Sequence, residues 1–170
     1  ALLITHEHSD HITGAGVMSR RYDIPIYATE KTHLAMNIGP INDYNIKTIN
    51  PEKQFEIGKF TINPFCISHD AADPIGFSFD NGNEKYSIVT DTGIITNSIL
   101  DSVSGSDYVM LESNHDVDML RTGPYPFTLQ KRILSNFGHL SNDACADAVC
   151  ALVNKGTTHF VLAHLSKENN

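Results

Sequence analysis

The sequence THEHSDHITG, residues 5–14, places three histidines and one aspartate within the six positions from His6 to His11. Alternate residues of a strand point to the same side, so His6 and His8 at the end of a short apolar strand can bind one ion together. Asp10 and His11 follow where the chain turns into a helix, and we expect them to face a second point close by. An exposed polar turn is the alternative, but four potential ligands at this spacing favour a metal site.

Three further potential ligands each stand at the end of a predicted strand: His69, Asp91 and His164. Strand ends are where α/β sheets place their sites, because loops converge there while the strands hold them rigid. Any one of these residues alone would more often be an ordinary core or surface residue. Their common position predicts that they meet the histidines of residues 6–11 in one place.

Short apolar strands alternate with helical stretches along the chain, which is the rhythm of an α/β protein. We predict strands over Leu2–Thr5, Ile26–Ala28, Phe55–Ile57, Phe60–Ile67, Ile75–Phe79, Tyr86–Thr90, Tyr108–Glu112 and Phe160–His164. We predict helices over Ile12–Arg20, Thr29–Met36, Ser98–Val103, Phe127–Phe137 and Ser141–Lys155. The Asn81-Gly82 pair indicates a hairpin between two of the central strands.

The composition favours one globular domain in a reducing compartment. The chain has 170 residues and a formal net charge of −8, which argues against a broad basic surface for nucleic acid. Two divalent ions would add four positive charges in one cleft, so local affinity for phosphate remains compatible with this charge. Cys66, Cys145 and Cys150 form no paired framework and are interpreted as buried thiols. With no apolar run of about 18 residues, we expect a cytoplasmic protein without a membrane span.

The run from His6 to His11 resembles the HxHxDH signature of the metallo-β-lactamase superfamily of hydrolases. The later ligands follow in the order of that family, within ISHD, VTDTG and LAHLS. The resemblance covers the whole chain and implies an α/β fold, the four-layer αβ/βα sandwich. It implies one metal held by His6, His8 and His69, a second held by Asp10, His11 and His164, and Asp91 bridging the two.

Two divalent ions at about 3.5–4 Å can hold a nucleophilic hydroxide and neutralise charge on a phosphoryl oxygen. Imidazole-rich ligand sets suit Zn²⁺, Mn²⁺ or Fe²⁺ better than Ca²⁺ or Mg²⁺. Asp10 and Asp91 offset only two of the four positive charges, so an anionic substrate is favoured.

The segment GHLSND, residues 138–143, resembles a His-x-Ser/Thr loop of phosphodiesterase branches such as RNase Z. His139 is therefore the candidate that contacts the scissile phosphate, with Ser141 or Asn142 capping the following helix. Glu112 could orient His139 or the region of Asp10. The predicted catalytic residues are thus Asp10, His139 and Glu112, whereas an exposed histidine at a helix start and an ordinary polar strand end are the alternatives.

Five segments together most resemble the YycJ/WalJ group of bacterial metallo-β-lactamase-fold proteins: HEHSDH, ESNHD, GPYP, GHLSN and AHLSKENN. This resemblance implies a metal-dependent 5′ to 3′ exonuclease acting on duplex DNA, with possible partners in DNA repair. Hydrolysis of a small cyclic phosphodiester is the alternative enzyme, and thioester or β-lactam hydrolysis fits less well. A non-catalytic, metal-stabilised interaction module or a truncated product is the alternative of another class.

Other polar and aromatic residues near these segments receive weaker interpretations. Asn114, His115 and Ser141 are predicted to bind substrate, and for Asn114 and His115 a structural turn is the alternative. Arg121, Arg132 and Lys167 could contact phosphate, but solvated surface charges are the expected reading. Aromatic residues in a proline-rich turn usually pack against the core, and we expect this of Tyr125 and Phe127; His33 and His159 are expected to take no part.

Members of the superfamily usually carry further strands before the HxHxDH strand and an αβ segment after the last metal histidine. We therefore expect residues 1–170 to form one metallo-β-lactamase-like domain that lacks N-terminal strands and a C-terminal segment. Such a domain would leave sheet edges and apolar surface uncovered.

Overall fold

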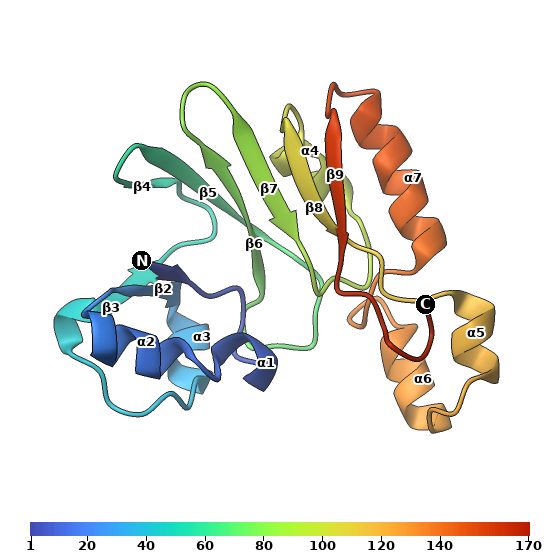
Figure 1. Cartoon of the computed structure of the whole chain (residues 1–170), viewed down its shortest axis with the longest axis horizontal. Helices are drawn as coiled ribbons and strands as arrows, with labels where there is room; N and C mark the ends of the chain where they lie inside the picture. Colours follow the sequence, from blue (N-terminus) through green and yellow to red (C-terminus); the bar gives the residue numbers. More distant parts are fainter.

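The computed structural model describes residues 1–170 and contains two β-sheets (Figure 1). The smaller sheet is parallel, in the order β1 (Leu2–Leu3), β2 (Ile26–Thr29) and β3 (Ile46–Ile49). The larger sheet has the order β4 (Phe55–Ile57), β5 (Phe60–Cys66), β6 (Ile75–Asp80), β7 (Lys85–Val89), β8 (Tyr108–Glu112) and β9 (His159–Ala163). Its pairs are antiparallel from β4 to β7 and parallel from β7 to β9, so β5, β7 and β9 all run in one direction.

Seven helices and one short 3₁₀ helix connect the strands. They are α1 (Ser9–Ile12), α2 (Ala15–Tyr22), α3 (Glu30–Ala35), η1 (Asp43–Asn45), α4 (Asn97–Val103), α5 (Val117–Thr122), α6 (Phe127–Ile133) and α7 (Asn142–Val153). Polar side chains start four of them by accepting a hydrogen bond from a free backbone N–H of the first turn: Thr29, Thr96, Asp116 and Ser141.

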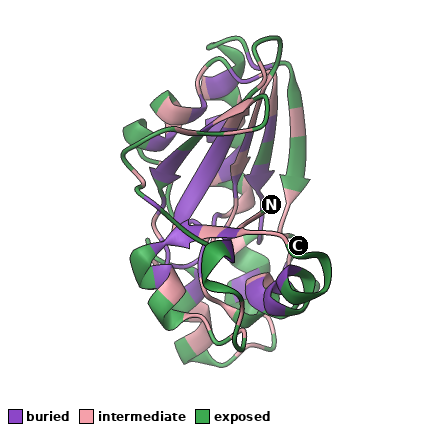
Figure 2. Cartoon of the chain, turned by 90° about the vertical axis from the view of Figure 1, so that its left-hand side faces the viewer, coloured by how far each residue is buried: buried purple, intermediate pink, exposed green.

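Three apolar clusters define the layers of the molecule. One lies between the larger sheet and the helices α4 and α7, with Val89, Ile99 and Leu152 among its members. A second joins the smaller sheet to α1 and α2. The third fills the space between the two sheets, where Ile49 of β3 meets Phe77 of β6. The order of layers is therefore helix, sheet, sheet, helix. Figure 2 shows that many of the buried residues lie in the strands.

Most predicted elements are present, and the differences have local causes. The predicted helix over Ile12–Arg20 is wrong in its bounds, because the chain forms α1 and α2 on either side of Thr13-Gly14. The predicted helix over Phe127–Phe137 stops at Ile133, where Ser, Asn and Gly follow and favour turns. The hairpin at Asn81-Gly82 is confirmed, with Gly82 at φ 85°.

Strand β3, helix α5 and the short 3₁₀ helix η1 were not predicted from the sequence. Strand β3 is mostly exposed and buries only Ile49, so it carries no apolar run. Helix α5 buries only Leu120. The predicted strand over Leu2–Thr5 is reduced to two ladder residues in β1, because only Leu2 and Leu3 pair with β2.

The interpretation of all three cysteines as buried is wrong for two of them. Cys145 is buried, whereas Cys66 and Cys150 are exposed, and all three are free thiols. Cys66 ends β5 on its outward-facing side, and Cys150 lies on the outer face of α7. None of the helices combines the length and the hydropathy that a membrane crossing requires.

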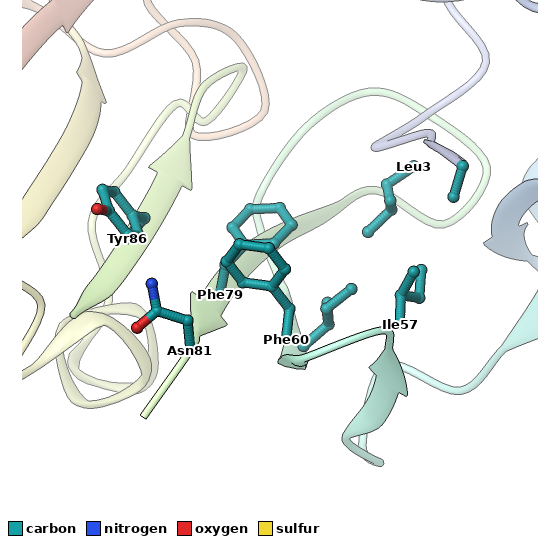
Figure 3. A pocket seen from close by; sticks show the side chains of 8 residues that line it. Leu3, Ile57, Phe60, Phe79, Asn81 and Tyr86 are labelled. Atoms are coloured by element: carbon teal, nitrogen blue, oxygen red, sulfur yellow. The ribbon is translucent and has the colours of Figure 1, made fainter. Parts of the chain in front are cut away.

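Apolar surface is open at two places, as expected. A hollow of about 530 Å³ beside the first residues is lined almost entirely by apolar side chains, Leu3, Phe60 and Phe79 among them (Figure 3). The edge strand β9 exposes about half of the surface of Val161 and Leu162. Neither surface includes a predicted metal ligand.

Candidate metal centre

The predicted ligands gather at one edge of the two sheets. Strands β5, β7 and β9 run in the same direction, so their carboxyl ends meet at this edge. His69, Asp91 and His164 follow these three strands. The segment after β1 and helix α1 reach the same edge below the sheets (Figure 1) and bring the ligands of residues 6–11.

The first group consists of His6, His8 and His69, whose potential ligand atoms all lie within 4.8 Å of one another. His69 Nε2 lies 3.2 Å from His8 Nδ1. The other nitrogen of His69, Nδ1, donates to the carbonyl oxygen of Gly138 at 3.1 Å, because that oxygen can only accept. His69 therefore keeps the lone pair of Nε2 for a metal.

His6 is the deepest member of this group, with none of its surface exposed. Burial, with the other histidines adding to it, lowers the pKa of His6 to about 2. The ring is consequently neutral at physiological pH, and the neutral form is the one that binds metal ions.

The second group consists of Asp10, His11 and His164, with ligand atoms again within 4.8 Å of one another. His11 Nε2 lies 3.6 Å from Asp10 Oδ2. Asp10 is largely exposed on its side chain, which places this group at the open side of the centre.

Asp91 lies between the two groups. Its Oδ2 is 3.3 Å from His11 Nε2, and its Oδ1 is 3.4 Å from His164 Nε2 and 3.9 Å from His69 Nε2. Asp91 and His164 both adopt the left-handed backbone conformation, with φ of 59° and 57°. Non-glycine residues in that conformation cost free energy and cluster at functional sites, where the surrounding structure holds them.

Two buried atoms of this centre show that its residues fit a metal ion. His6 Nε2 and Asp91 Oδ2 are shielded from solvent and have no hydrogen-bond partner in the protein. A buried polar atom without a partner is costly, and an unpaired carboxylate oxygen especially so. Coordination of a divalent cation satisfies both atoms at once.

Glu112 supports the centre from below and is completely buried. Its Oε1 accepts hydrogen bonds from His139 Nδ1 and His164 Nδ1, each at 2.8 Å, and its Oε2 accepts one from the backbone N–H of Thr92. Burial opposes ionisation, but the hydrogen bonds from the two histidines outweigh it, and the pKa of Glu112 lies below its ordinary value. The same contact raises the pKa of His164.

His139 lies beside the centre, with its Nδ1 3.8 Å from Asp91 Oδ1. Since Glu112 accepts from Nδ1, the Nε2 atom of His139 is left available for a further partner. This is the geometry expected of a histidine that contacts a substrate near the metals.

The three residues predicted to bind substrate make contacts within the protein. His115 is only 1% exposed and Asn114 is 9% exposed, so both lie beneath the surface. Asn114 Nδ2 donates to the backbone oxygen of His164 at 2.7 Å and thereby holds a metal ligand in place. The hydroxyl of Ser141 accepts from Ala144 N as the cap of α7. Asn114 and Ser141 thus make supporting contacts within the protein, Asn114 also lines a groove with His139, and the contact of these residues with substrate stays a prediction.

One expectation about surface residues is wrong and one holds. Arg132 is an exposed surface charge, as expected, and it forms a two-pronged pair with Asp70, with its Nη2 3.0 Å from Oδ1. Phe127 does not pack against the core: it is 68% exposed, with the Lys131 ammonium 4.7 Å from its ring centre. His33 and His159 lie outside the cluster, as expected; His33 contacts the Lys47 backbone oxygen.

Thr5 and Gly138 also shape the site, and neither role was predicted from the sequence. The Thr5 hydroxyl lies 3.0 Å from His6 Nδ1 and 3.3 Å from His11 Nδ1, so it links the two groups of ligands. The position of Thr5 directly before the histidine run was the sequence feature that could have indicated this role. The contact of Gly138 with His69 joins residues 69 positions apart and had no sequence signal.

A family model described as the β-lactamase superfamily domain matches residues 1–165. The chain belongs to this family. The crystal structure of the metallo-β-lactamase fold protein YhfI from Bacillus subtilis superposes with a TM-score of 0.72 at 18% identity, covering 97% of this chain and 64% of that one. The fold is thus the metallo-β-lactamase fold, which implies binding of divalent metal at the candidate ligand groups.

Two curated relatives align along the chain. Exodeoxyribonuclease YycJ of Bacillus anthracis is 44% identical over 174 residues, covering 99% of this chain. Exodeoxyribonuclease WalJ of Streptococcus pneumoniae is 40% identical over 174 residues, covering 100% of this chain. The chain spans 65% of the length of each of these relatives.

Proposed function

We propose that the chain carries the catalytic centre of a dinuclear metal-dependent phosphodiester hydrolase, and that it acts as a 5′ to 3′ exonuclease on DNA. The observation that carries the proposal is the position of Asp91 between two groups of ligands, with one buried oxygen unpaired. The names of the two relatives support DNA as the substrate.

The seven ligands divide into two coordination sets. His6, His8 and His69 would hold one ion, and Asp10, His11 and His164 would hold the other, with Asp91 close to both sets. Zn²⁺, Mn²⁺ and Fe²⁺ suit these imidazole-rich sets. Such ions would lower the pKa of a water molecule and offset charge on a phosphoryl oxygen.

The chain's own residues perform the remaining steps. Glu112 fixes the ring of His139 through Nδ1, so that Nε2 of His139 faces the substrate side. A proton on that nitrogen stabilises the negative charge that develops on the phosphoryl group, or passes to the leaving oxygen. Asp10, at the open side and with its Oδ2 3.6 Å from His11 Nε2, would act as a metal ligand there.

The charge and the thiols of the chain agree with this proposal. A net charge of −8 leaves little general attraction for DNA, so we expect the metal ions to supply much of the local affinity for phosphate. Three free thiols, two of them exposed, suit a reducing compartment, and we place the activity in the cytoplasm, where DNA-repair partners could deliver the substrate.

The test is digestion of 5′-labelled duplex DNA in the presence of Mn²⁺. The chain should release the labelled terminal nucleotide early, and Asp91→Asn should not, although asparagine tolerates the left-handed backbone at φ 59°. Asp118→Asn, an exposed carboxylate on α5, is the matched control and should digest normally.

Other outcomes would replace the proposal with one of its alternatives. Hydrolysis of a cyclic phosphodiester but not of DNA would indicate a small-molecule phosphodiesterase. A metal-induced rise in melting temperature without hydrolysis of either substrate would indicate a metal-stabilised module.

A further inference from the structure

A groove of about 280 Å³ has His139 among its lining residues. Tyr125 also lines it, and Leu129 and Ile133 of α6 add apolar surface. Lys167 and Arg132 bring positive charge to the rim. The groove thus combines an aromatic ring, an apolar surface and cations next to the residue that contacts the scissile phosphate.

We propose that this groove holds one nucleoside of the substrate, with its base stacked on Tyr125 and its outer phosphate against Lys167. The proposal rests on the proposed function and adds a subsite to it. Stacking of bases on aromatic side chains is the usual way to bind single nucleotides without selecting one base, because every base has a π-face.

The backbone around Tyr125 is held in place. Pro124 and Pro126 flank it and fix their own φ angles, with Pro126 at −56°. The backbone oxygen of Tyr125 accepts a hydrogen bond from Gln130 Nε2 at 2.9 Å. The ring itself is half-buried and has no aromatic partner within the chain, so one face is left for a base.

The segment after β9 places Lys167. The backbone N–H of Ser166 donates to the Asn114 oxygen at 2.8 Å, and Asn170 Nδ2 donates to the Ser113 oxygen at 2.6 Å. Asn169 between them is 1% exposed, so the segment is packed down on both sides of the lysine.

The two cations of the rim differ in what they already bind. Arg132 is engaged by Asp70, whereas Lys167 is exposed and forms no ion pair. Lys167 is therefore the charge available to a phosphate.

The size of the groove limits what it can hold. Pockets for drug-sized ligands span roughly 300–1,000 Å³, so a groove of about 280 Å³ is of a size for a single nucleoside.

The test compares two ligands by isothermal titration of the chain in Mn²⁺. One is deoxyadenosine 3′,5′-bisphosphate, and the other is the same bisphosphate on an abasic tetrahydrofuran sugar. We expect the adenine to improve binding by about tenfold, within the range for one stacked base. Tyr125→Ala should remove this preference, Tyr125→Phe should keep it, and Tyr22→Ala, an exposed tyrosine on α2, should leave it unchanged.

Lys167→Ala tests the charge. It should weaken both ligands equally, by about twofold to fivefold for one exposed charge pair, while Lys53→Ala, an exposed lysine of a turn, changes neither. Equal binding of the two ligands by the wild-type chain, or a preference that survives in Tyr125→Ala, overturns the proposal. Adenine preference without DNA digestion would instead keep the subsite and refute the nuclease activity.

Discussion

Replacement of Glu112 by glutamine tests the central support of the metal centre. Three donors point at this side chain: His139 Nδ1 and His164 Nδ1 at Oε1, and the Thr92 N–H at Oε2. Glutamine offers one oxygen and one NH₂ group in place of two oxygens. Whichever way its amide turns, at least one donor therefore faces another donor in a fully buried place.

The magnitude follows from those contacts. One buried donor without an acceptor costs about 1–3 kcal/mol. The loss of the negative charge also weakens the remaining hydrogen bonds, since charge-assisted ones are roughly twice as strong as neutral ones. We expect Glu112→Gln to lower the free energy of unfolding of the metal-free chain by about 2–4 kcal/mol, and to lower metal affinity or turnover by about 10- to 100-fold.

Urea unfolding in a chelator measures the first effect, and metal titration followed by DNA digestion measures the second. Glu56→Gln, an exposed carboxylate on β4, is the matched control and should match the wild type in both assays. If Glu112→Gln unfolds at the wild-type urea concentration and keeps its metal affinity, then Glu112 does not hold the two histidines as described.

Three further predictions concern the metal, the sheet and the loop behind His69. Zn²⁺ at 100 times its dissociation constant should stabilise the chain by about 2.7 kcal/mol. Asp91→Asn should lose most of this stabilisation in a thermal melt. An equal stabilisation of the variant would contradict the ligand assignment. Burial lowers the pKa of Lys85, so between that pKa and 10.5 the unfolded chain binds more protons, and the free energy of unfolding should rise with pH. Urea unfolding at several pH values measures this slope, which Lys85→Met should flatten. An unchanged slope would exclude Lys85 as its source. A Cβ on Gly138 would lie 2.2 Å from the backbone oxygens of Arg132 and Ile133. Gly138→Ala should therefore destabilise the chain by about 1–3 kcal/mol and disturb His69. Gly14→Ala, with open space around it, is the control, and equal melting temperatures of the two variants would refute the packing argument.

The ligand positions could be predicted because they obey a regular rule of chain geometry. His69, Asp91 and His164 each follow a strand, and the three strands β5, β7 and β9 run in one direction. Their carboxyl ends must then meet at one edge. The prediction required the bounds of the strands only to within a residue or two.

Contacts between distant loops could not be predicted in the same way. The carbonyl of Gly138 that orients His69 belongs to a turn after α6, and the sequence predicted helix as far as Phe137. The burial of His115 likewise depends on how β8 and α7 pack, since its bridge partner is Ser141. Local sequence patterns predict where a residue lies along a helix or strand. They do not predict which loop packs over that residue.

Strain in the backbone is the other feature that the sequence did not reveal. Asp91 and His164 occupy left-handed conformations that ordinary residues avoid, and neither is a glycine. Such a conformation turns the side chain back toward the sheet edge immediately after the strand ends. The free energy it costs is offset by the contacts of Asp91 with the surrounding histidines and by the hydrogen bond of His164 to Glu112.

The shared oxygen of Glu112 joins metal binding to substrate binding. His164, a predicted metal ligand, and His139, the residue at the nucleoside groove, both donate to Oε1. A metal ion bound by His164 would withdraw electron density from that ring and strengthen the hydrogen bond from its Nδ1 to Glu112. The carboxylate would then be held more firmly, and with it the ring of His139. Metal and nucleotide should therefore bind cooperatively, and each should increase the affinity of the other by the same factor.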